Sequence, residues 1–350
     1  MNIDTIAKKV KNLKPASRAA FEKNVVLLFD QFYEAAVLRK PYRLVLDSNI
    51  IIQLENYRED SVSEGLLSIF LFFDYFRRSS FDADIVVMPS VFYEFLRQKS
   101  IASAREHWKQ FKNVKTVIKK ELGFPALFDE VVTFEEAKHY CELIEEDAKK
   151  IEAELVRYRK TNWQFNLVGT LGGEVPPFFA ARGLYKELGL RYFNEALASR
   201  FLIEHMARNI AECKENDQRI IRKYVRKDDF LLTKVLKLHK DKIKGLADVD
   251  IWTRCNVQTQ SNWQAHERYV PASIGLSLDR NLAKALSFFS NPYVTFEVAS
   301  ENDIDDNMAI TEEGHDDIIR VEEGQERKLR VGGEQAEYLK EVLPLILDED

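Results

Sequence analysis

The chain has few cysteines, and their placement suits neither a metal site nor a disulfide framework. Three cysteines (Cys141, Cys213 and Cys255) are scattered over 350 residues. The six histidines also show no paired metal spacing. We therefore expect no zinc site and no disulfide framework, and this cysteine usage suits a reducing, cytoplasmic compartment.

Long apolar runs and several common catalytic motifs are missing as well. No window approaches eighteen uninterrupted apolar residues, and the charged start M-N-I-D-T-I-A-K-K-V-K lacks the apolar core of a signal peptide. We therefore expect no membrane partner. The sequence contains no G-x-x-x-x-G-K-[ST] loop and no G-x-S-x-G elbow, which argues against a nucleotide-hydrolysing motor and a serine hydrolase.

The composition is that of an ordinary globular protein, but its charge is uneven. Hydrophobic residues make up 45% of the chain and charged residues 31%, with a net charge of −6. The segment from Glu301 to the end holds 17 acidic and 5 basic residues, or −12, which leaves +6 on the first 300 residues. This balance is compatible with a nucleic-acid partner, and equally with an acidic C-terminus that serves only solubility.

Two predicted strands, far apart in the chain, each end on an acid. The stretch Tyr42 to Leu54 reads Y-R-L-V-L-D-S-N-I-I-I-Q-L, a short apolar strand that ends on Asp47 and runs into a helix. The stretch 273–279 reads S-I-G-L-S-L-D and ends on Asp279. Open α/β sheets bind ligands at the carboxyl ends of their strands. We therefore expect both acids on neighbouring strand ends.

Further acids occur at two predicted helix starts. A strand at 84–88, closed by a proline, leads into a helix with Ser90 as its expected N-cap and Glu94 one turn inside. The stretch from residue 245 opens another helix with Asp248 and Asp250 in its first turn. Carboxylates gathered at close range repel one another unless a cation lies between them, and oxygen-only ligands suit Mg²⁺ or Mn²⁺.

Helical periodicity dominates the rest of the chain. The predicted fold class is α/β, with a small, mostly parallel sheet flanked by helices and a large helical insertion. A long helix over 133–160 begins with a capping box of Thr133 and Glu136. We divide the chain into an N-terminal helical segment (1–40), an α/β core (41–100 plus 245–300), a helical insertion (101–244) and an acidic tail with a terminal helix (301–350).

Four motifs, in this order, resemble those of the PIN-domain nucleases, which belong to the FEN-like 5′-nuclease superfamily. The first strand of that family ends in Asp-(Thr/Ser)-Asn followed by apolar residues, and D-S-N-I-I-I (47–52) is similar. M-P-S-V-F-Y-E-F (88–95) resembles the second motif, D-V-D-I (248–251) the third, and S-L-D-R-N-L (277–282) the fourth. The resemblance covers about 43–100 and 245–300.

The resemblance implies a metal-dependent endonuclease that uses Mg²⁺ or Mn²⁺ to hydrolyse phosphodiester bonds. Its metal-binding acids would be Asp47, Glu94, Asp248 and Asp279. Asn49 would brace the first acid, and Ser277 would orient the fourth. Asp250 competes with Asp248 for the third role. A nucleic acid would be the partner, with RNA favoured over DNA.

Structural alternatives stay open beside this interpretation. Singly, the acids could be helix caps, turn residues or complements to a helix dipole. The PIN-like core could also be an inactive scaffold for protein interaction or nucleic-acid binding. Basic stretches at 109–120 and 219–227 could be solvated helix faces or a phosphate track. A homodimer through the helix 133–160, or a regulatory protein partner, is a further alternative.

Overall fold

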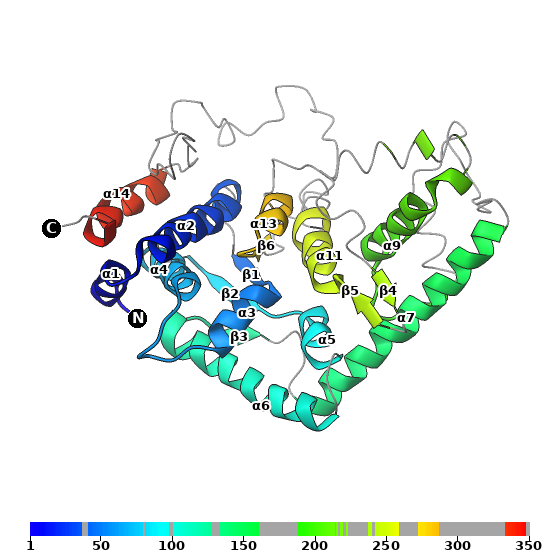
Figure 1. Ribbon diagram of the computed structural model, residues 1–350, viewed down its shortest axis with the longest axis horizontal. Helices are drawn as coiled ribbons and strands as arrows, with labels where there is room; N and C mark the ends of the chain where they lie inside the picture. The colour runs from blue at the N-terminus through cyan, green and yellow to red at the C-terminus, as the bar shows by residue number, and fades with distance from the viewer. Residues whose placement is uncertain are drawn as a thin grey trace. The chain divides into compact units, whose positions relative to one another are not determined.

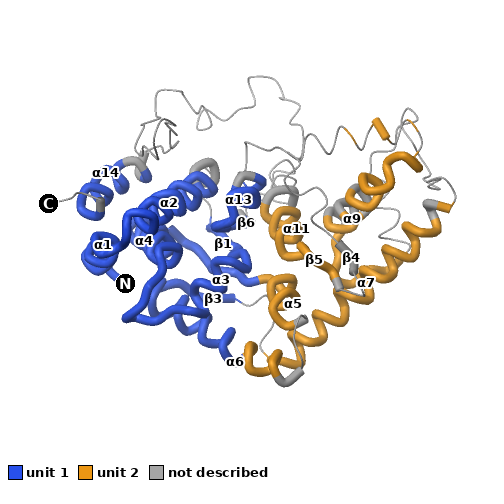
Figure 2. The backbone as a smooth tube through the Cα atoms, viewed as in Figure 1, with its two compact units in different colours: residues 1–87, 109–127, 259–350 blue, residues 88–108, 128–258 orange. Residues whose placement is uncertain are grey.

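The protein forms two compact units of α/β and helical structure. The computed structural model describes residues 1–36, 41–79, 81–97, 101–127, 133–160, 188–213, 215, 218–219, 222, 237–239, 242–258, 272–286 and 333–347. Unit 1 comprises Met1–Val87, Lys109–Leu127 and Thr259–Asp350, and unit 2 comprises Met88–Trp108 and Phe128–Gln258 (Figure 2). No described helix has the length and apolar content needed to cross a membrane.

A four-stranded sheet, parallel throughout, forms the centre of unit 1. Its order is β3-β2-β1-β6, with β1 at Tyr42–Leu46, β2 at Ala83–Val86, β3 at Ala126–Leu127 and β6 at Ala272–Leu276. The predicted α/β class with a small parallel sheet is therefore confirmed. The strand β3 was missed, because two residues carry no detectable alternation.

Helices cover this sheet and bury an aromatic core. Those of unit 1 are α1 (Ile3–Lys11), α2 (Pro15–Ala36), α3 (Ser48–Glu55), α4 (Glu64–Arg78), the π-helix η1 (Ile118–Leu122), α13 (Arg280–Leu286) and α14 (Gly333–Leu347). The helix α2 packs against α4 and β6 (Figure 1). The sequence spaces five apolar residues of this helix at helical intervals, which predicts a buried face, and all five are buried: Phe21, Val25, Leu28, Phe29 and Phe32. The rings of Phe32 and Phe76 lie 4.5 Å apart and join α2 to α4.

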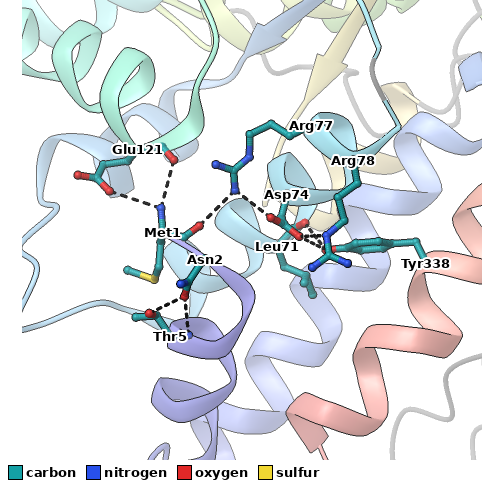
Figure 3. A network of polar contacts seen from close by, with 9 residues as sticks. All are labelled: Met1, Asn2, Thr5, Leu71, Asp74, Arg77, Arg78, Glu121 and Tyr338. Carbon is teal, nitrogen blue, oxygen red and sulfur yellow. Dashed lines mark hydrogen bonds and ion pairs between the residues drawn. The ribbon is translucent and has the colours of Figure 1, made fainter.

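A buried acid on α4 anchors the terminal helix α14 to unit 1 (Figure 3). The Tyr338 hydroxyl donates to Asp74 Oδ2 at 3.1 Å and to the Leu71 carbonyl at 3.2 Å. Arg77 and Arg78 each form an ion pair with Asp74 at 2.9 Å. Burial, reinforced by the Asp74 charge, raises the pKa of Tyr338. The predicted terminal helix is therefore present and docked through this network.

The start of α1 joins the same region. The Met1 ammonium group donates to the Glu121 carbonyl at 3.3 Å and lies 3.5 Å from its carboxylate. Arg77 donates to the Met1 carbonyl at 3.2 Å (Figure 3). Asn2 caps α1 by accepting from the Thr5 amide. These contacts tie the first helix to α4 and η1.

Unit 2 is mainly helical. Its elements are α5 (Pro89–Arg97), α7 (Phe134–Lys160), α9 (Glu195–Arg208), the 3₁₀ helix η2 (Ile210–Glu212), β4 (Lys237–His239), β5 (Lys242–Lys244), α11 (Leu246–Trp252) and the π-helix η3 (Thr253–Gln258). The helix α6 (Ile101–Val117) begins in unit 2 and ends in unit 1. The predicted capping box of α7 is confirmed, because Thr133 N donates to Glu136 and Glu136 N donates to Thr133.

Some sequence expectations differ from the structure. Ser90 lies inside α5, and its predicted role as N-cap is wrong because Pro89 already occupies the first helical position. The stretch 101–244 is not wholly helical, since it contains β3 and the β4–β5 hairpin. The sequence also predicts a loop at 170–177 and a final strand at 293–298, and both stretches lie outside the described residues.

Candidate functional site

The paired strands β1 and β6 bring Asp47 beside Ser277. Leu46 and Leu276 are register partners, so the residues that follow them meet at the carboxyl edge of the sheet. Asp47 is 2% exposed. Its Oδ1 accepts from the Ser48 amide at 2.5 Å, and its Oδ2 accepts from Ser277 Oγ at 2.7 Å. The Asp47 carboxylate is therefore held in one orientation at this edge.

Asn49 extends this arrangement to Asp279. The Asn49 side-chain amide donates to Ser277 Oγ at 3.0 Å, and its oxygen accepts from the Leu278 amide at 3.0 Å. The Asp279 amide donates to the same Ser277 Oγ at 2.9 Å. Ser277 thus bonds to residues of both the first and the fourth predicted motif.

Asp279 is exposed and caps α13. Its Oδ1 accepts from the amides of Asn281 at 2.8 Å and Leu282 at 2.9 Å. The predicted strand end at Asp279 is displaced, because β6 ends at Leu276 and Asp279 lies three residues beyond it. Asp279 nevertheless lies close enough to Asp47 for its charge to raise the Asp47 pKa.

Gln31, which the sequence did not single out, supports the same strand end. It lies on α2 and is 2% exposed. Its Nε2 donates to the Ser277 carbonyl at 2.9 Å, and its Oε1 accepts from the Ser277 amide at 2.8 Å. This two-way pairing satisfies both backbone groups of the residue that bonds to Asp47. The sequence feature that could have pointed to Gln31 is a polar residue directly before Phe32, on a helix whose apolar face is buried.

We expect Gln31→Leu to lower the free energy of unfolding by about 2 kcal/mol, because it leaves the buried Ser277 amide and carbonyl without partners. Urea unfolding measures this change. Gln53→Leu is the matched control, since Gln53 accepts one side-chain bond from Ser63 and is only half-buried. Equal losses for the two variants would show that Gln31 does not brace the Ser277 backbone.

Burial sets the electrostatics of Asp47. Desolvation raises the pKa of Asp47, the hydrogen bonds from Ser277 and Ser48 lower it, and the charge of Asp279 raises it further, with a net upward shift. Burial, with a smaller contribution from the Asp279 charge, therefore disfavours the ionised form of Asp47 and raises its pKa. A cation placed beside the two acids would reverse this effect by favouring the charged form.

In unit 2, Glu94 lies at the start of the helix that carries Asp248. Glu94 Oε1 accepts from the Ala247 amide at 3.2 Å. Gly245 occupies the N-cap position of α11 with φ at 70° and has no side chain to cap the helix. Glu94 therefore supplies the acceptor that Gly245 lacks. Asp248, half-buried, follows in the first turn.

Asp250 has a different environment from Asp248. It is fully buried, its Oδ2 accepts from the Tyr192 hydroxyl, and Arg254 Nε donates to its Oδ1 at 2.9 Å. Burial, with the Asp250 charge next, raises the pKa of Tyr192 well above its usual range. Residues two apart on a helix point to opposite sides. Asp250 is thus an ion-paired core residue, which leaves Asp248 as the better candidate for the third motif.

The predicted acids form two pairs, each within its own unit. Asp47 and Asp279 lie together in unit 1, and Glu94 lies beside the helix start of Asp248 in unit 2. Within the described ranges, no group of three or more His, Cys, Asp or Glu side chains could hold a metal ion. The oxygen donors of unit 1 still fit Mg²⁺, which proteins often bind through one or two carboxylates while it keeps several waters.

Comparisons with known proteins leave the geometry as the main guide to function. No family model matches this chain, and neither does any curated protein or solved structure.

Proposed function

We propose that this protein is a metal-dependent nuclease with a PIN-like core, which hydrolyses phosphodiester bonds and favours RNA over DNA. The observation that carries the proposal is the network around Ser277. It joins Asp47 and Asn49 of the first motif to Asp279 of the fourth motif. These residues follow the carboxyl ends of two adjacent parallel strands. Ligand sites of open α/β sheets occur at such strand ends.

In this proposal Asp47 and Asp279 hold Mg²⁺ or Mn²⁺ through their carboxylate oxygens. Ser277 orients the Asp47 carboxylate by donating to it, and Asn49 holds Ser277 in place. The Asp279 backbone amide donates to the same Ser277 hydroxyl, which keeps the two acids at one edge of the sheet. The resemblance implies metal-binding roles for Glu94 and Asp248 as well, and these two residues lie in unit 2. We assign the third role to Asp248 and not to Asp250, because Arg254 and Tyr192 bond to the Asp250 carboxylate.

The reaction is the addition of water across a phosphodiester bond. Water attacks the phosphorus in line, the bond to the 3′ oxygen breaks, and that oxygen takes up a proton. The products carry a 3′-hydroxyl and a 5′-phosphate. When bound, the ion supplies a lowered pKa for water and positive charge for the developing oxyanion. The chain's own residues hold the ion's ligands in fixed orientations.

Cleavage of labelled RNA and DNA by the full chain tests the proposal, with Mg²⁺, Mn²⁺ or EDTA present. We expect cleavage only with a metal ion, and at least a hundredfold loss in Asp279→Asn, or about 2.7 kcal/mol. Asp82→Asn is the matched control, since Asp82 is exposed at the amino edge of the same sheet. Cleavage that persists in EDTA, or an active Asp279→Asn, would contradict the assignment.

An inactive PIN-like scaffold is the second candidate. It is favoured by the structural use of Glu94 as a helix cap and by the missing three-carboxylate group among the described residues. Titration calorimetry with Mn²⁺ separates the two functions. A nuclease should bind Mn²⁺ in a manner that depends on Asp47 and Asp279, whereas a scaffold should not.

A further inference from the structure

A stripe of lysines follows one face of α6 and η1. We define the lysine stripe as Lys109, Lys112, Lys115, Lys119 and Lys120, all of which are exposed and lie in unit 1. At about 100° per residue these positions fall on one side of the helix. No acidic residue occurs between positions 109 and 120. No acid of this segment therefore interrupts the stripe, and at its end Lys120 lies 3.9 Å from the Glu121 carboxylate.

The opposite face of the same helix is fully used in packing. It carries the buried side chains Phe111, Val114, Ile118 and Leu122. A helix that lies on a membrane surface must insert an apolar face into the lipid. Since this apolar face is already buried within the protein, the stripe has charge to offer a partner but no apolar surface.

The helix α7 is also rich in charged residues, but its charges are of both signs, unlike those of the lysine stripe. There the lysines and arginines alternate with acids, and pairs such as Lys138–Glu142 and Arg157–Glu154 form along the helix. Within the described part of the chain, Lys109, Lys112 and Lys119 have no ion pair with an acid. Unbalanced charge of one sign destabilises a helix slightly, so a partner of opposite charge is the natural complement.

We propose that the lysine stripe binds the phosphate backbone of a nucleic acid, independently of sequence. The stripe is about 16 Å long at about 1.5 Å per residue, which matches several consecutive phosphates of one strand. Lysine presents a compact point charge, which suits phosphate oxygens and carries no base specificity. This inference deepens the proposed function, because the bound backbone would be that of the substrate.

Salt-dependent binding of a labelled single-stranded RNA to the full chain, measured in EDTA, tests the stripe. The variant is Lys109→Gln/Lys112→Gln/Lys119→Gln, and the matched control is Lys14→Gln/Lys23→Gln/Lys149→Gln, which removes three equally exposed lysines elsewhere. Glutamine has a helix propensity close to that of lysine, so both variants should fold. Melting temperatures verify this for each.

A plot of the logarithm of the binding constant against the logarithm of the salt concentration has a negative slope. We expect the stripe variant to reduce the magnitude of this slope by about 2 to 3, and the control variant by less than about 1. When salt rises from about 50 to 200 mM, the fold-loss of RNA affinity should be about thirty times smaller for the stripe variant than for the wild type. Single-stranded DNA should behave in the same way. No binding of either nucleic acid, or equal slopes for the two variants, would overturn the proposal.

Two further measurements compare RNA with other anionic partners, and separate the role of the lysine stripe from the proposed nuclease function. Tighter stripe-dependent binding of poly-glutamate, or of phosphatidylserine vesicles, than of RNA would also overturn it. Stripe-dependent RNA binding without any metal-dependent cleavage would support the stripe and remove the nuclease assignment. Metal-dependent cleavage with an unchanged salt slope in the stripe variant would support the nuclease assignment and overturn the role of the lysine stripe.

Discussion

Asp47→Asn is expected to reduce metal-dependent cleavage about a thousandfold while the protein stays folded. The substitution removes the buried charge that would hold the ion and keeps the volume of the side chain. Asp82→Asn, at the opposite edge of the sheet, should change neither cleavage nor stability. An Asp47→Asn protein that cuts RNA at the wild-type rate would remove Asp47 from the site.

The effect of Asp47→Asn on stability follows from two opposing contributions. Removal of a desolvated charge stabilises the fold. However, one end of the new amide is a donor, and both the Ser48 amide and Ser277 Oγ donate to Asp47 in the wild type. One of these bonds is therefore weakened, at a cost of about 1 kcal/mol. We expect a melting temperature within a few degrees of the wild type.

In the metal-free protein, the stability difference between Asp47→Asn and the wild type is expected to depend on pH. Because the folded-state pKa of Asp47 is raised above its usual value of 3.8, the folded protein holds this proton more tightly than the unfolded chain. Its contribution to stability is full below about pH 3.8 and is lost as the pH rises through the folded pKa. In EDTA, the stability of Asp47→Asn relative to wild type should therefore increase over this window. A constant difference would contradict the raised pKa.

Asp147→Ala is expected to lower the free energy of unfolding by about 4 kcal/mol. Asp147 is fully buried on α7. Its Oδ2 accepts from three consecutive backbone amides, those of Arg191 at 2.8 Å, Tyr192 at 2.6 Å and Phe193 at 3.1 Å. Alanine would leave all three amides without this acceptor.

Urea unfolding of Asp147→Ala and two controls measures this effect. Asp147→Asn keeps an acceptor oxygen and should cost less than the alanine variant. Glu142→Ala removes an exposed acid of the same helix whose ion pair is with Lys138, so it should change stability by about 0.5 kcal/mol or less. A loss for Asp147→Ala no larger than that for Glu142→Ala would show that the three amides find other partners.

Local sequence patterns predicted the elements that hold the first and fourth motifs. The strand that ends before Asp47, the start of α3 and the apolar face of α2 follow from periodicity and capping residues alone. The parallel sheet followed from strands separated by helices. The short strand β3 and the β4–β5 hairpin were missed, because strands of two or three residues carry no detectable alternation of apolar and polar residues.

The roles of individual acids were less accessible from the sequence. Asp248 and Asp250 stand two residues apart and look alike in the sequence. Their difference arises from Tyr192 and Arg254, of which the first is 58 positions away from Asp250. Asp147 appears in the sequence as one acid among many on a charged helix, and only its burial against the 191–193 segment gives it a structural role.

The sequence by itself determined the α/β class, the strand–acid–helix turn at Asp47 and the capping of α7, because these depend on neighbours within a few residues. Only the tertiary structure decided that Gln31 braces Ser277 and that Glu94 caps α11. Those bonds join residues 246 and 153 positions apart, and pairing at such separation is fixed by the packing of whole elements, which local propensity does not encode.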